Sequence, residues 1–104
     1  MSNNIILNTI KDLITFYVKE NYNNYLKTNN IDKIPENDIN IVIEDIYLKN
    51  KKHIKSFIKS SLKELYKNEC PSDLILDNIL QDIFSDDRLC INKLNKEIIK
   101  YQDN

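Results

Sequence analysis

The sequence predicts an all-α protein, a compact bundle or orthogonal array of about five helices within a single domain. Apolar residues recur at three- and four-residue steps in five successive stretches, and short polar segments separate these stretches. The 104 residues include no glycine and only two prolines, so few positions can interrupt a helix. A chain of this length is expected to bury one core, and hydrophobic residues, at 41%, are numerous enough to form it.

The first predicted helix covers residues 5–27. At about 100° per residue, one wide arc collects most of its large apolar side chains: Ile6, Ile10, Leu13, Ile14, Tyr17, Val18, Tyr22 and Tyr25. Phe16 and Leu26 fall outside this arc. Asn29 and Asn30 are expected to end the helix, because asparagine tolerates the left-handed conformation found at helix C-termini.

The second and third predicted helices cover residues 35–49 and 51–67, with a break or kink at Asn50. Pro35 suits a first helical turn because it lacks an amide hydrogen. A strand over residues 39–43 is disfavoured, since Glu44 and Asp45 break a two-residue alternation. The predicted buried positions are Ile39, Ile41, Val42, Ile43, Ile46, Tyr47 and Leu48 in the second helix and Ile54, Phe57, Ile58, Leu62 and Leu65 in the third.

The fourth and fifth predicted helices cover residues 73–85 and 87–101. Pro71 prevents the third helix from continuing, and Ser72 is expected to cap the fourth. Asp86 and Asp87 favour the start of the fifth, where the helix dipole is positive. The predicted buried faces contain Leu76, Ile79, Leu80 and Ile83, followed by Cys90, Ile91, Leu94, Ile98 and Tyr101.

Charge and hydropathy indicate which partners and which cellular compartment to expect. Sixteen acidic and 15 basic residues leave a net charge of −1, which argues against binding nucleic acid through bulk charge. No apolar run approaches the roughly 20 residues of a membrane span, and the start MSNN does not resemble a signal peptide. We therefore expect an intracellular protein, cytoplasmic or nuclear, without membrane contact. Its bias toward Ile, Asn and Lys indicates an AT-rich genome, such as that of a large DNA virus, a protist or a low-GC bacterium.

Residues for catalysis or cofactor binding are scarce. Phosphate-binding loops of the Walker and dinucleotide types need glycine, which is absent, and a single histidine excludes an HExxH zinc site. Cys70 and Cys90 form no CxxC pair and are expected to be plain thiols. A cysteine hydrolase that uses Cys70 with His53 is the remaining enzymatic hypothesis, and Cys90 fits it less well because it lies on an apolar stripe. We expect no enzyme, no cofactor and no metal.

A row of lysines is the strongest candidate for a binding site. Its members follow one another at three- and four-residue steps along one face of the predicted third helix: Lys52, Lys55, Lys59, Lys63 and Lys67. In the simplest interpretation this lysine strip is a solvated face. As a docking strip, it would bind phosphates or an acidic segment, and the aspartates of the predicted fourth helix could meet it from another copy or from the same one.

The function expected from these observations is contact with another protein. Small helical domains without catalytic residues most often act in this way, so we expect a non-catalytic adaptor or a small subunit of a larger assembly. Self-association through the long first helix is one form that such contact could take. The alternative is a nucleic-acid-binding accessory protein that contacts phosphates through the lysine strip.

Overall fold

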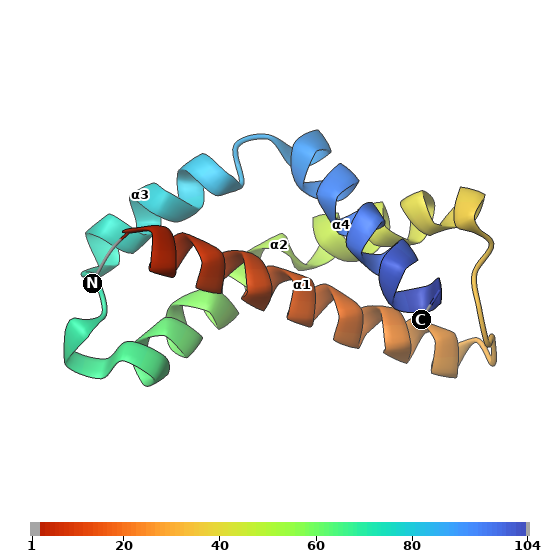
Figure 1. Ribbon diagram of the computed structural model, residues 1–104, viewed down its shortest axis with the longest axis horizontal. Coiled ribbons are helices and arrows are strands. Elements are labelled where there is room, and N and C mark those ends of the chain that lie inside the picture. Colours follow the sequence, from red (N-terminus) through yellow and green to blue (C-terminus); the bar gives the residue numbers. More distant parts are fainter. Residues whose placement is uncertain (1–2, 104) are drawn as a thin grey trace.

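Four α-helices form the protein, as Figure 1 shows for the computed structural model, which describes residues 3–103. In chain order they are α1 (Asn3–Thr28), α2 (Glu36–Tyr66), α3 (Asp73–Ile83) and α4 (Asp87–Asp103), with a short 3₁₀ turn, η1 (Lys67–Glu69), after α2. The residues in this range include no strand. The predicted all-α class is therefore confirmed, and the strand considered for residues 39–43 lies within α2.

The predicted count of five helices is wrong, because the segments 35–49 and 51–67 form one continuous helix, α2. Asn50 lies inside it and causes no break. Its side-chain amide donates a 2.8 Å hydrogen bond to the Ile46 carbonyl, one turn back, so the polar group is satisfied within the helix. An interior asparagine costs a helix less than about 1 kcal/mol, whereas burial of Ile54 and Ile58 on the following turns favours continuation by more.

The crossing of α1 and α2 organises the core. Both helices bury a row of side chains at four-residue steps, and such rows are inclined by about 26° to a helix axis. When two of these rows interdigitate, the helices cross at about 50°, and Figure 1 shows α1 and α2 crossing obliquely. The buried members are Ile6, Ile10, Ile14, Val18 and Tyr22 in α1 and Ile46, Ile54, Ile58 and Leu62 in α2, where the half-buried Asn50 follows Ile46 in the row.

Polar and aromatic contacts add to the apolar packing between α1 and α2. The hydroxyls of Thr9 and Tyr66 share a 2.7 Å hydrogen bond, and Tyr17 lies with its ring centroid 5.5 Å from that of Phe57. Phe16, which the sequence left off the buried arc, stacks on Phe57 with ring centroids 6.2 Å apart. These contacts bring the N-terminal half of α1 beside the C-terminal half of α2.

The two shorter helices cover the space that opens where α1 and α2 diverge. α4 packs on the N-terminal half of α2 through Ile91, Leu94 and Ile98, and its last turn reaches α1. α3 lies against the C-terminal half of α2 and buries Leu76 and Leu80. One hydrophobic cluster includes buried residues from all four helices.

Helix ends follow the sequence signals closely. Asn30 adopts a φ of 54°, and hydrogen bonds from Asn30 N to Lys27 O and from Ile31 N to Leu26 O close a Schellman motif after α1. The Ser72 hydroxyl accepts the Ile75 amide at the start of α3, and an Asp86 carboxylate oxygen accepts the Leu89 amide at the start of α4. The helix end predicted at Asn29 and Asn30 and the cap predicted at Ser72 are confirmed, and Asp86, predicted as a favourable charge at a helix start, also caps α4.

Several residues predicted to be buried are exposed instead. Ile41 and Leu48 were expected to widen the buried stripe of α2, yet they are 67% and 48% exposed. Conversely, Phe84 and Ile34 lie outside every predicted helix face but are buried. The other predicted core positions found exposed are Tyr25, Leu65 and Tyr101.

The buried row of α2 can be tested against its exposed side. We expect Ile58→Ala to lower the free energy of unfolding by about 2–5 kcal/mol, because it leaves a cavity at the crossing. Leu65→Ala, at a position of the same helix that is 60% exposed, should change it by less than about 0.5 kcal/mol. Urea denaturation followed by far-UV circular dichroism measures both, and equal losses would contradict the packing described here.

Candidate functional site

Two of the five lysines of the strip form ion pairs with aspartates of α3. Lys59 Nζ lies 2.8 Å from an Asp77 carboxylate oxygen, and Lys63 Nζ lies 2.9 Å from an Asp73 carboxylate oxygen. The hydrogen bond with Asp77 raises the pKa of Lys59, and the hydrogen bond from Lys63 lowers the pKa of Asp73. Two central members of the strip are thus paired with the neighbouring helix of the same chain, one of the arrangements considered from the sequence.

The other three lysines of the strip lie in different surroundings. Lys55 Nζ is 5.6 Å from the centroid of the Phe84 ring, a cation–π contact. Lys67 ends α2 with a φ of 47° and lies in the exposed turn η1. Lys52 is exposed and forms no ion pair with any residue from 3 to 103. The five lysines therefore do not form one free row of charge.

A second polar group joins α2 to the start of α4. Tyr47 Oη and Lys51 Nζ donate hydrogen bonds of 2.9 and 2.8 Å to the same Asp87 oxygen. The bond from Lys51, followed by that from Tyr47, lowers the pKa of Asp87. Burial, and then the bond to Asp87, raises the pKa of Tyr47. These bonds join α2 to the first residue of α4, and the buried Tyr47 ring also stacks on Phe84, which precedes α4.

The residues of the enzymatic hypothesis lie on α2, directly after η1 and in the first turn of α4. His53 is exposed on α2, while Cys70 and Cys90 are free thiols of intermediate burial. The Cys90 thiol donates to the Ile83 carbonyl at 3.2 Å, a contact at the end of α3. Across residues 3–103, no group of three or more His, Cys, Asp or Glu side chains is arranged to hold a metal ion.

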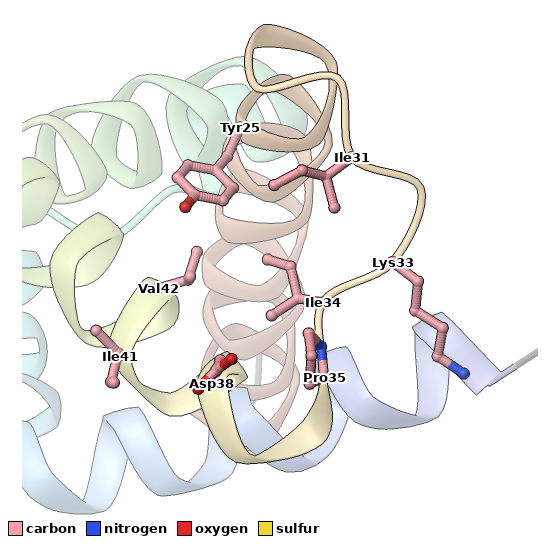
Figure 2. A pocket seen from close by; sticks show the side chains of 8 residues that line it. All are labelled: Tyr25, Ile31, Lys33, Ile34, Pro35, Asp38, Ile41 and Val42. Atoms are coloured by element: carbon pink, nitrogen blue, oxygen red, sulfur yellow. The ribbon is translucent and has the colours of Figure 1, made fainter.

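An apolar hollow of about 300 Å³ lies where the loop between α1 and α2 meets the first turns of α2. In Figure 2, Tyr25, Ile31, Ile34 and Val42 point toward a common space, whereas Lys33 points away from it. Lys33 forms an ion pair with Asp103 at 3.4 Å. The hollow is lined by Tyr25, Ile31, Lys33, Ile34, Pro35, Asp38, Ile41 and Val42.

Gln102, near the end of α4, fixes the shape of this loop. Its side-chain amide donates to the Ile34 carbonyl at 2.8 Å, and its side-chain oxygen accepts the Ile34 amide at 3.0 Å. The Tyr22 hydroxyl also donates to Gln102. Ile34 is therefore held with its side chain in the core, at the base of the hollow. Sequence reasoning missed Gln102, because a lone polar residue near the C-terminus carries no pattern.

Exposed apolar residues recur along α2 beyond the hollow. Ile41 lies at the edge of the hollow, and Leu48, seven residues later, occupies the same side of the helix two turns on. We call Tyr25, Ile31, Ile41, Val42 and Leu48 together the open face. Leu74, another exposed apolar residue, lies on α3 and does not line this hollow. The signal available in the sequence was the excess of apolar residues in α2 over what one buried stripe needs.

Comparison of the chain with protein-family models, with curated proteins and with solved structures gives no match. In the part of the chain that the structure describes, every helix is too short or too polar to cross a bilayer. Function is therefore inferred from the geometry of the chain itself.

The Asp87 contacts predict a dependence of stability on acid. Because the pKa of Asp87 is lower in the folded chain than its ordinary value of about 3.9, its ionised form stabilises the fold above that value. This contribution is lost as the pH falls through the lowered pKa. We expect Asp87→Asn to be less stable than the wild type at pH 7, with the difference shrinking below about pH 4.

Urea denaturation at several pH values measures this difference. Asp32→Asn is the matched control, because Asp32 is exposed and forms no ion pair with another residue in the range 3–103. A gap between wild type and Asp87→Asn that stays constant down to pH 3 would contradict the assignment.

Proposed function

We propose that this chain is a non-catalytic protein-interaction module, an adaptor or a small subunit of a larger assembly, which binds its partner through the open face. The observation that carries the proposal is the exposure of Ile41 and Leu48 on one side of α2, beside an apolar hollow. Large apolar side chains exposed beside an apolar hollow on a small domain are typical of a contact site.

The energetics of burial support this assignment. Complete burial of an isoleucine or leucine side chain is worth up to about 1.5–3 kcal/mol, and Ile41 and Leu48 are 67% and 48% exposed in the free chain. A partner that covers them gains part of this free energy, from which the cost of association is subtracted. The rigid setting of the hollow, fixed by Gln102, lowers that cost because little needs to be ordered on binding.

The lysine strip gives weaker support to nucleic-acid binding. Lys59 and Lys63 would have to leave Asp77 and Asp73 before they could contact phosphates, and those carboxylates would then repel the nucleic acid. The net charge of −1 adds no long-range attraction. Lys52 and Lys67 are the two exposed strip members that form no ion pair among residues 3–103.

For the open face, we expect Leu48→Asp to abolish partner binding, because it places a charge in an apolar contact. Leu74→Asp is the matched control, since Leu74 is 73% exposed but lies on α3, away from the open face. Affinity capture from the cells that express the protein, quantified by mass spectrometry, compares the variants with the wild type. A partner retained equally by Leu48→Asp and the wild type would contradict the proposal.

The nucleic-acid alternative predicts a different result. Phosphate contacts would make the logarithm of the binding constant fall with the logarithm of salt concentration, with a slope of about −0.9 per neutralised phosphate on duplex DNA. We expect no measurable binding to duplex or single strands in a low-salt fluorescence titration. Tight, steeply salt-dependent binding that Lys52→Ala weakens would instead support the lysine strip as a phosphate site.

A further inference from the structure

Five exposed side chains form a straight seam along the N-terminal half of α2. Asp38, Ile41, Asp45, Leu48 and Lys52 follow one another at steps of three, four, three and four residues. This spacing keeps them on one side of the helix, as in the contact line of a coiled coil. All five are exposed, and two of them, Ile41 and Leu48, belong to the open face.

The charged and apolar residues of the seam are ordered so that the seam complements a second copy of itself running in the opposite direction. Read from the N-terminus, it runs acidic, apolar, acidic, apolar, basic. If two such helices lie antiparallel, one register places Asp38 opposite Lys52 of the second copy and Ile41 opposite Leu48 of the second copy. The same register recurs at the other end of the seam, as the two-fold symmetry of an isologous dimer requires.

We propose that the partner on the open face is a second copy of this chain, paired through the two α2 helices in antiparallel orientation. This inference rests on the proposed function and names its partner. It places self-association on α2, whereas the sequence suggested α1. The contact surface consists of the seam and the apolar hollow at its end.

The charges at the ends of the seam are available for this pairing. Neither the Asp38 carboxylate nor the Lys52 ammonium has an ion-pair partner among residues 3–103. Lys33, the other charged residue at the hollow, is engaged by Asp103 and points away. Asp38 is thus the charge that remains at the rim, where Lys52 of a second copy arrives.

The centre of the seam is compatible with two-fold symmetry. The two Asp45 residues approach each other at the axis, which would be unfavourable for isolated carboxylates. In each copy, however, Asp45 Oδ2 lies 3.2 Å from Lys49 Nζ of the same chain, so the two residues at the axis form a pair without net charge. Lys49 of each copy also lies within one turn of Asp45 of the other in this register.

The hollow gives the apolar pair a place to pack. Leu48 of the second copy lies opposite Ile41, which borders the hollow, and the volume of about 300 Å³ accommodates a leucine side chain. An acidic partner would complement only the Lys52 end of the seam, and a basic partner only the Asp38 end. A helix that complements both ends needs a basic residue opposite Asp38, apolar residues opposite Ile41 and Leu48, and an acidic residue opposite Lys52. The antiparallel α2 of a second copy provides all of these.

Reversal of charge tests the register. The mass of the purified wild type, measured by sedimentation across a range of concentrations, should rise from 12.4 kDa toward twice that value. Asp38→Lys and Lys52→Glu should each shift the midpoint of this rise to at least tenfold higher concentration, since like charges then face each other at both ends. The double variant should restore the wild-type midpoint.

Lys96→Glu is the matched control, because Lys96 is exposed on α4 outside the seam, and it should leave the midpoint unchanged. Circular dichroism verifies that each variant is folded. A wild type that stays at 12.4 kDa at every concentration, or a double variant no better than either single variant, would overturn the inference.

The same variants separate this inference from the function on which it rests. If the purified chain is monomeric while Leu48→Asp still removes a captured partner, the inference of a second copy is wrong, but the proposal that the open face binds a partner is supported. If Leu48→Asp changes neither the mass nor the captured partner, both are wrong.

Discussion

The oblique contact between α1 and α2 is the constraint on which the rest of the structure depends. Both helices present their buried side chains at four-residue steps, with Ile10 and Ile14 in α1 and Ile54 and Ile58 in α2 near the centre of each row. Rows of this kind cannot lie parallel and still interdigitate, so the helices diverge on either side of the contact. α3 and α4 are placed by this divergence, because each covers the core that one of the openings would expose.

This arrangement gives the two halves of α2 different surroundings. α1 and α4 cover two sides of its N-terminal half, and the remaining side carries Ile41 and Leu48 in the open. On the same side of the C-terminal half, Lys59 and Lys63 meet the aspartates of α3. One continuous helix therefore offers an apolar contact surface in its first turns and internal ion pairs in its last. Because α2 continues through Asn50, the two regions lie on one helix.

Polar side chains fix the helices at the places where apolar packing leaves freedom. Asp87 receives hydrogen bonds from Tyr47 and Lys51 and sets the position of α4 on α2. Gln102 holds the backbone of Ile34 and so sets the path of the loop beside the hollow. Such directed bonds, which here are partly buried, select one arrangement among several that would bury similar apolar area. The shape of the open face depends on both.

The sequence by itself determined the helical class, the buried rows and the helix ends at Asn30, Ser72 and Asp86, because each follows from periodicity or from local hydrogen bonding. It did not determine that α2 runs through Asn50, that Ile41 and Leu48 face outward, or that Phe84 and Ile34 are buried. Periodicity shows which residues share a side of a helix, but contacts between distant segments decide which sides find a neighbour. The tertiary structure alone therefore decided where apolar surface stays open and which lysines are already paired.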